Sequence, residues 1–351
     1  RSTTMDHVLK KYCPRIEFDS YEDFAENFTI EVPEAFNFGF DVVDEWAAVE
    51  PDKRALLWTN DAGEERVFTF TDIKRLSNQA ANAFKELGIG KGDVVMCILR
   101  RRWEYWVCAV ALCKLGATII PASLQLTRKD VVYRANSADV KAIVAVNDEY
   151  VCTQVEEAMP DCPTVREKFI VDGSREGWVD FDELIASYPD TFERPTGEAG
   201  VTSKDIMLMY FTSGTTGNPK AVEHNFAHPL GHIITAKYWQ QVQENKLHMS
   251  VTDSGWAKFG WGKIYGQWIA GATIFAYDMD KFVPTKLLQK IQDYKLTTFC
   301  APPTMYRMMI KEDLTRYDLS SVRHATIAGE ALNPEVFRQL EKLTGLKVME
   351  G

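Results

Sequence analysis

The sequence lacks several features that would define its class at once. The seven cysteines are odd in number and scattered, with no C-x-x-C pair, so they predict neither a disulfide framework nor a zinc site. The longest apolar segment, Tyr105 to Leu112, is far too short to span a membrane, and the first residues contain no apolar signal-peptide core. We therefore expect a soluble protein of a reducing compartment, the cytoplasm, without membrane insertion.

An excess of basic residues is also absent. The 351 residues include 40 Lys and Arg against 50 Asp and Glu, which gives a formal net charge of −10. This balance argues against a nucleic-acid partner, although local positive charge can still hold a small anion. With 46% hydrophobic residues, a chain of this length can bury more than one core. A homodimer is one assembly that the sequence leaves open.

The order of the apolar runs predicts the fold class. Apolar strands alternate with helical segments from Val94 to Val146, and a second alternating series begins at Ile206. This alternation is typical of parallel sheets covered on both faces. We predict an α/β fold with two stacked, mostly parallel α/β subdomains. The expected parts are a covering segment with a hairpin (1–70), a first subdomain (71–188), a linker (189–203) and a second subdomain (204–351).

Two similar stretches occur in the two series. Residues 114–120 (KLGATII) and 269–275 (IAGATIF) each leave a predicted helix through a glycine and enter a predicted strand. The similarity has two interpretations. It is either the common chemistry of helix-to-strand loops, or the trace of two related α/β layers that face each other across a ligand cleft.

The most specific stretch follows the apolar run Ile206–Phe211. Residues 212–220 (TSGTTGNPK) contain four hydroxyls, two glycines and a lysine. Backbone N–H groups, hydroxyls and an ammonium group suit anionic phosphate oxygens, whereas Gly/Ser/Thr clusters also form ordinary surface loops. The strand before and the lysine behind favour the phosphate loop. A Walker A loop is excluded, because two residues separate Gly217 from Lys220 and no hydroxyl follows.

A second candidate segment, residues 252–262, follows another predicted strand and alternates aromatic residues with glycines. It is interpreted either as ordinary core aromatics or as a slot for an apolar acyl or aryl group. We also expect Lys258 and Cys300 to approach each other, so that the ammonium group favours the thiolate. The residues assigned to the acyl slot are Trp256, Phe259, Gly260 and Trp261.

These segments resemble the adenylate-forming superfamily, which includes acyl-CoA synthetases, aryl-CoA ligases and adenylation domains. The TSGTTGNPK string is similar to the phosphate-binding signature of that superfamily. The similarity extends to the medium-chain acyl-CoA synthetases through Glu223-His224, DSGW at 253–256, APPTMYRM at 301–308 and GEAL at 329–332. The resemblance therefore covers most of the chain.

The resemblance implies an AMP-forming acid–thiol ligase. ATP would activate a medium-chain fatty acid, or a related branched or aryl acid, to an acyl-adenylate, and the acyl group would pass to CoA. The implied cofactors and partners are ATP, Mg²⁺, CoA and the acid. The implied phosphate and ATP contacts are Thr212, Ser213, Gly214, Thr215, Thr216, Gly217 and Lys220; the adenine contacts are Gly329, Glu330, Ala331, Glu350 and Gly351; the CoA contacts are Gln125 and Arg134.

The same resemblance places the catalytic lysine in a C-terminal domain beyond Gly351. The chain is therefore expected to be an N-terminal part that is inactive alone, with no catalytic residue or metal ligand assigned within it. Two alternatives stay open: an adenylation domain that passes an amino or aryl acid to a carrier protein, and a non-catalytic nucleotide-binding module. His224 is expected to cap or pack rather than act as a general base, and Arg100–Arg102 to be a solvated charge run rather than a CoA phosphate contact.

Overall fold

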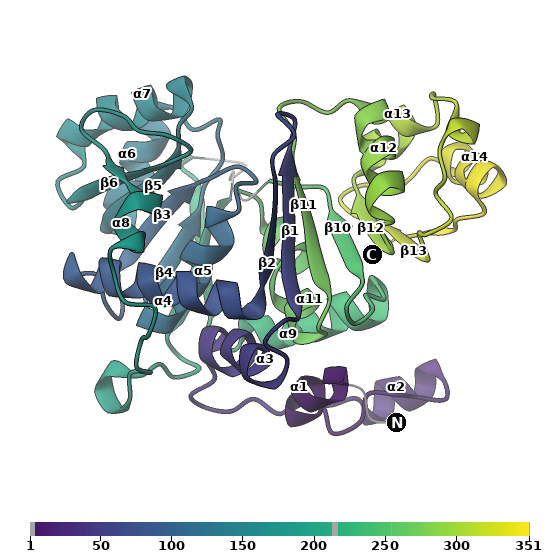
Figure 1. Ribbon diagram of the computed structural model, residues 1–351, viewed down its shortest axis with the longest axis horizontal. Helices are drawn as coiled ribbons and strands as arrows, with labels where there is room; N and C mark the ends of the chain where they lie inside the picture. Colours follow the sequence, from purple (N-terminus) through teal and green to yellow (C-terminus); the bar gives the residue numbers. More distant parts are fainter. Residues whose placement is uncertain (1–3, 213–216, 254, 351) are drawn as a thin grey trace.

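The computed structural model describes residues 4–212, 217–253 and 255–350, which form two seven-stranded sheets (Figure 1). Each sheet is parallel except for one antiparallel hairpin at its edge. The predicted α/β fold with two mostly parallel sheets is confirmed. In spatial order, sheet A contains β14 (Val348–Glu350), β13 (His324–Ile327), β12 (Thr298–Ala301), β10 (Leu247–Ser250), β11 (Thr273–Asp278), β1 (Arg54–Asn60) and β2 (Glu65–Thr69).

Sheet B is built on the same plan from the other part of the chain. The expected strands are present in both sheets, whereas two strands of sheet B, β7 and β9, were not predicted. β9 is exposed and mostly polar, so it shows no apolar run. In spatial order, sheet B contains β7 (Val179–Asp180), β6 (Glu167–Val171), β5 (Val140–Val146), β3 (Val94–Ile98), β4 (Thr118–Pro121), β8 (Ile206–Thr212) and β9 (Lys220–Asn225).

The two hairpins cross the predicted division of the chain. β1–β2, from the segment 1–70, joins sheet A through β11, and β8–β9, from the segment 204–351, joins sheet B through the pairing of Ile119 with Leu208. The sheets therefore do not follow the predicted boundaries, because a strand pairs with a distant partner that its own residues do not identify. Whether the predicted segments act as separate domains stays a prediction.

Side chains at alternate strand positions face different hydrophobic cores. Helices accordingly lie between the two sheets and on the outer face of each sheet (Figure 1). In β3, Val95 and Cys97 face the core between the sheets, whereas Val94, Met96 and Ile98 face an outer core. Between the sheets lie α4 (Phe70–Glu86) and α5 (Glu104–Leu115). The outer face of sheet B is covered by α6 (Arg128–Ser137) and α7 (Glu149–Ala158), and that of sheet A by α12 (Pro284–Tyr294), α13 (Pro303–Met309) and α14 (Pro334–Thr344).

The other helices are short and join these layers. None of the described helices is long and apolar enough to cross a membrane. Two single-turn π-helical segments, at Gly39–Val43 and Ile234–Trp239, adjoin α-helices. The short α-helices are α1 (Thr4–Tyr12), α2 (Tyr21–Asn27), α3 (Asp44–Val49), α8 (Phe181–Ala186), α9 (His228–Ile233), α10 (Ala257–Gly262) and α11 (Tyr265–Ile269).

Helix α5 is buried along its whole length, including both of its charged ends. A helix that is covered on every side belongs to the core. At its C-terminal end, Lys114 Nζ donates hydrogen bonds to Asp44 Oδ1 (2.8 Å), Ser77 Oγ (3.0 Å) and Asn78 Oδ1 (2.8 Å). These partners compensate the loss of water that burial imposes on the ammonium group.

The two similar stretches of sequence occupy equivalent places in the two sheets. After α5 the chain turns at Gly116, with φ +78°, into β4, and after α11 it turns at Gly271, with φ +76°, into β11. Both glycines have the left-handed conformation that often ends a helix. β4 and β11 each lie third from the hairpin edge of their sheet. This equivalence supports the interpretation as two related α/β layers.

An ion pair joins the two sheets at the carboxyl ends of β3 and β11. Arg100 donates to both carboxylate oxygens of Asp278, from Nε at 2.7 Å and from Nη2 at 3.0 Å. Arg101 donates to the Met279 carbonyl at 2.8 Å, and Arg102 pairs with the buried Glu104. The expectation of a solvated charge run is therefore wrong, because all three guanidinium groups bond within the fold.

Replacing Asp278 by Asn should destabilise the fold, because Asp278 is 1% exposed and the variant leaves Arg100 with only the exposed Asp280, 3.9 Å away, as a counter-charge. We expect a loss of about 2–3 kcal/mol in the free energy of unfolding, measured by urea titration. The matched control is Glu335→Gln, which breaks the exposed pair with Arg338 and should cost less than about 0.5 kcal/mol. Equal losses in the two variants would contradict this role of the buried pair.

Candidate functional site

The carboxyl edges of the two sheets meet at Gly255. Parallel strands of one sheet end along one edge, which is where ligands bind in open α/β sheets. A Cβ at Gly255, in the turn after β10, would lie 2.5 Å from Ser123 N and 2.6 Å from Ser123 Cα, in the turn after β4. Only glycine allows this approach of two backbones. The Arg100–Asp278 pair makes a second link at the same junction, so the candidate site lies here.

The base of the predicted phosphate loop is closed by a strand pair. Thr212 and Lys220 face each other in the β8–β9 ladder, and Thr212 Oγ1 donates to the Lys220 carbonyl at 3.4 Å. Both side chains are exposed, and Gly217 has φ +85°. The predicted contacts Ser213, Gly214, Thr215 and Thr216 lie outside the described residues. The described part places a hydroxyl and an amine at the carboxyl end of the buried strand β8.

A cleft of about 270 Å³ lies beside the loop, at the junction of the sheets. Its lining includes Gln125 and Arg134, the two predicted CoA contacts, together with Phe211 and Trp256. The Arg134 guanidinium lies 5.3 Å from the centroid of the Phe211 ring, and its burial lowers the pKa of Arg134. The structure therefore brings the predicted CoA residues together with one residue of the predicted acyl slot.

The other predicted slot residues lie elsewhere, because residues 257–262 form helix α10. Phe259 is fully buried, with its ring centroid 4.6 Å from that of Tyr105 and 5.0 Å from that of Trp106. Trp261 packs on Trp239 at 5.5 Å. A Cβ at Gly260 would lie 2.8 Å from the hydroxyl oxygen of Tyr210, so this glycine permits close packing. Of the three predicted aromatic walls, only Trp256 lines the cleft, where it is 57% exposed.

A buried polar cluster under α10 was missed by sequence reasoning. His248 Nδ1 lies 2.7 Å from Thr298 Oγ1, and His248 Nε2 lies 2.8 Å from Ser250 Oγ. Burial lowers the pKa of His248 to about 3, so the ring is neutral near neutral pH. Lys263 is also fully buried, and burial lowers its pKa to about 7. The signal for this cluster was the polar spacing in an otherwise apolar strand, LHMSV.

Lys258 and Cys300 interact, but the predicted thiolate does not follow. Burial raises the pKa of the Cys300 thiol, and the charge of Lys258 opposes this shift without overcoming it. Burial also lowers the pKa of Lys258. The ammonium group thus acts in the predicted direction, but burial outweighs it, because both charged forms lose their hydration in the same buried place, so Cys300 stays a thiol.

The predicted adenine segment follows β13 and contacts β14. Gly329, with φ +108°, is exposed together with Glu330 and Ala331, and a Cβ at Gly329 would have no atom within 4 Å. The backbone N–H of Leu332 donates to Glu350 Oε1 at 2.9 Å. Glu350 is thereby held beside this segment, and the contact of both with adenine stays a prediction. Gly351 lies outside the described residues.

His224 belongs to a row of three histidines that runs from β9 into α9. Its ring is stacked on His228 with centroids 4.0 Å apart, and His228 Nε2 lies 2.9 Å from His232 Nε2. Burial lowers the pKa of His224, that of His228 to about 3 and that of His232 to about 4. These contacts support the expected packing role of His224.

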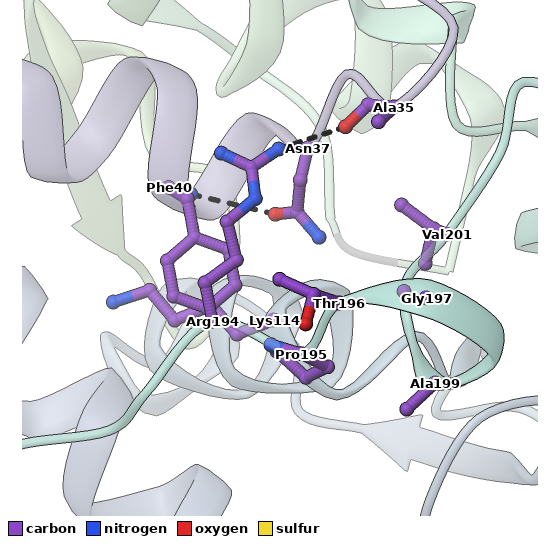
Figure 2. Close-up of a pocket in the computed structure, with 11 residues that line it drawn as sticks. Ala35, Asn37, Phe40, Lys114, Arg194, Pro195, Thr196, Gly197, Ala199 and Val201 are labelled. Carbon is purple, nitrogen blue, oxygen red and sulfur yellow. Dashed lines mark hydrogen bonds between the residues drawn. The ribbon is translucent and has the colours of Figure 1, made fainter.

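A second cavity, of about 190 Å³, lies between the N-terminal segment, the end of α5 and the linker (Figure 2). Phe40 lies between the cations of Lys114 and Arg194 there. Arg194 bonds to both carboxylate oxygens of Asp41 and to the Ala35 carbonyl, and Lys114 has the three partners described above. Because both cations already have partners, we assign no charged ligand to this cavity.

Comparison with protein families gives one match over most of the chain. The model of the family described as AMP-binding enzyme matches residues 43–351. Mouse acyl-coenzyme A synthetase ACSM3, mitochondrial (Mus musculus), is 36% identical over 95% of this chain and 58% of its own length. Rat acyl-coenzyme A synthetase ACSM4, mitochondrial (Rattus norvegicus), is 37% identical over 91% of this chain and 56% of its own length. The chain thus spans less than two thirds of these relatives.

Solved structures share the fold. The anthranilate CoA ligase AuaEII, solved in complex with anthranoyl-AMP, superposes with a TM-score of 0.81 at 24% identity, over 90% of this chain and 60% of that one. The acyl-CoA synthetase of Brucella canis gives a TM-score of 0.78 at 20% identity, over 89% of this chain and 56% of that one. At these identities the comparisons support the architecture.

Truncation of Phe259 should cost much more stability than truncation of Trp256. Phe259→Ala removes a fully buried ring and should cost about 3–5 kcal/mol of unfolding free energy, measured by urea titration. Trp256→Ala removes an exposed ring and should cost less than about 1 kcal/mol, because little packing is lost. The placement of Phe259 in the core would be wrong if its truncation were as mild as that of Trp256.

The pKa of His248 predicts a loss of stability in acid. Its folded pKa, about 3, lies below the value of about 6.5 in an unfolded chain. The contribution of neutral His248 to the free energy of unfolding is therefore complete above about pH 6.5. It is lost as the pH falls toward 3, by up to about 1.4 kcal/mol per pH unit. The His248→Gln variant cannot take up this proton. We expect its unfolding free energy to depend less steeply on pH between about 7 and about 5; slopes equal to those of the parent would contradict the assignment.

Proposed function

The chain belongs to the AMP-binding enzyme family, and from this premise we propose that the full-length protein activates a carboxylic acid with ATP and transfers the acyl group to the thiol of CoA. One observation carries the proposal. Strand β8 ends at Thr212, which pairs with Lys220 at the start of β9. This end of the hairpin lies beside the cleft that is lined by Gln125, Arg134 and Trp256.

The chemistry explains why such a loop is needed. A carboxylate oxygen attacks the α-phosphorus of ATP, the bond to pyrophosphate breaks, and a mixed anhydride with AMP forms. The thiol sulfur then attacks the acyl carbon and AMP leaves. The protein contributes mainly position and positive charge on the leaving pyrophosphate. We assign this role to Lys220 and to Gly217, which is exposed and has φ +85°.

The proposed cofactors are ATP, Mg²⁺ and CoA. The described residues contain no group of three or more His, Cys, Asp or Glu side chains that could hold a metal ion. Mg²⁺ usually binds through phosphate oxygens and water with few protein ligands, so the nucleotide would supply most of its ligands. For CoA we propose Gln125 and Arg134, and for adenine the segment Gly329–Ala331 with Glu350.

The proposed acid is a medium-chain fatty acid or a related branched or aryl acid. The relatives are named acyl-coenzyme A synthetases, and the exposed indole of Trp256 offers an apolar surface in the cleft. The same loop would also serve an adenylation domain that loads a carrier protein. A non-catalytic nucleotide-binding module is the third alternative, and it predicts binding of ATP without turnover.

The cellular compartment and the oligomeric state are also proposals. All seven cysteines are buried and free, which supports a reducing compartment. The cytoplasm stays a prediction, and the names of the relatives place those proteins in mitochondria. A homodimer likewise stays a prediction.

Lys220→Ala in the full-length protein should lower kcat/KM for acid-dependent AMP formation by about 100-fold or more, because it removes a charge from the pyrophosphate side. The exposed position of Lys220 predicts an unchanged melting temperature. Lys204→Ala, at another exposed lysine before β8, is the control and should retain the parental rate. A parental rate in Lys220→Ala would exclude Lys220 from the mechanism.

A panel of fatty, aryl and amino acids distinguishes the alternatives. We expect pyrophosphate exchange and CoA-dependent AMP release with medium-chain or aryl acids. Exchange with amino acids and no thioester to CoA would favour the carrier-protein alternative. ATP binding without exchange for any acid would favour the binding module and overturn the proposed ligase.

A further inference from the structure

Tyr133 of α6 contacts the chain on both sides of the predicted phosphate loop. Its hydroxyl donates to the Pro219 carbonyl at 2.9 Å, and its ring lies edge-on to Phe211 with centroids 6.2 Å apart. Phe211 lies in β8 before the loop, and Pro219 directly precedes β9. One side chain thus touches the entry and the exit of the loop.

Helix α6 offers a firm support for this contact. A capping box fixes its first turn: Thr127 Oγ1 accepts from the Asp130 N–H, and the Asp130 carboxylate accepts from the Thr127 N–H. The apolar face of the helix packs on the outer core of sheet B through Val131 and Ala135, which are fully buried. Tyr133 is therefore held by an element that is itself anchored to the sheet carrying β8.

The position of the bonded carbonyl is specific. The Pro219 carbonyl belongs to the peptide unit whose nitrogen is that of Lys220. Because a peptide unit is planar, a hydrogen bond to this carbonyl fixes the orientation of the peptide plane that also contains the nitrogen and Cα of Lys220. The ring of Pro219 restricts the φ of Pro219 itself, and Lys220 is held by its pairing with Thr212 in the β8–β9 ladder. The backbone of Lys220 is thus constrained from two directions.

We propose that Tyr133 is a positioning residue for Lys220. Its hydroxyl holds the Pro219–Lys220 peptide so that the ammonium group stands where a nucleotide phosphate binds. The neighbouring Arg134 lies over Phe211 and lines the cleft, so α6 connects the loop with the predicted CoA contacts. The role toward phosphate rests on the proposed function, whereas the anchoring of the loop does not.

The anchoring can be tested without any substrate. Tyr133→Phe removes only the hydroxyl, and native-state trypsin cleavage after Lys220 should become about three- to tenfold faster, as expected for one lost hydrogen bond. The melting temperature should change by less than about 2 °C. Tyr150→Phe, on α7 and 47% exposed, is the matched control and should be cleaved at the parental rate. An unchanged cleavage rate in Tyr133→Phe would overturn the anchoring.

Kinetics of the full-length protein test the second part. In Tyr133→Phe, KM for ATP should rise about three- to tenfold, while KM for the acid stays at the parental value. A parallel rise of both KM values with a lower melting temperature would show a general structural defect and overturn the positioning role. If the parent shows no acid-dependent pyrophosphate exchange, the proposed function and the role toward phosphate both fail, and the trypsin experiment still decides whether Tyr133 anchors the loop.

Discussion

The contact between the carboxyl edges of the two sheets is the constraint on which the site depends. Two sheets could pack through their apolar faces at many relative positions, but the bidentate pair of Arg100 with Asp278 and the backbone approach at Gly255 allow few of them. The strands that flank the predicted phosphate loop, β8 and β9, belong to sheet B, whereas the predicted adenine segment follows a strand of sheet A. Residues on the two edges can contact one ligand only if this junction keeps its geometry. A bidentate ion pair with a buried carboxylate tolerates little displacement, so it suits this role.

The equivalent strand order of the two sheets gives the fold an approximate internal repeat. Each sheet ends in an antiparallel hairpin. The strand next to the hairpin, β11 in sheet A and β4 in sheet B, follows a helix and a glycine in the left-handed conformation. The difference between the halves lies in the hairpin connections. In sheet A the link between β1 and β2 is the short turn at residues 61–64, whereas in sheet B the link between β8 and β9 is the longer glycine-rich stretch. The same plan thus carries a plain turn on one side and the candidate phosphate loop on the other.

The sequence predicted the strands well because parallel strands buried on both faces are continuous apolar runs, as at Val94–Ile98. The sequence could not show which sheet each hairpin joins, since the pairing that adds β8 to sheet B, Ile119 with Leu208, joins residues far apart in the chain. In the site, the residue types of TSGTTGNPK predict a phosphate loop without any tertiary information, and this role stays a prediction. The aromatic segment could not be interpreted in this way, because Phe259 and Trp256 have the same character and differ only in burial. The prediction for Arg100–Arg102 was wrong because charge in the sequence does not show that bonding partners, such as Asp278 on β11, lie nearby in the fold.

Helix α5 has a consequence for how the molecule opens. All of its side chains are covered, and the core that contains it includes strand residues of both sheets. Its amide hydrogens can exchange with deuterium only when the layers on both sides withdraw. The two halves of the molecule therefore share one cooperative unit in their middle, although each has an outer layer of its own that can loosen independently. We therefore expect motion that widens the cleft to occur at the strand ends and their loops, while the core around α5 stays packed.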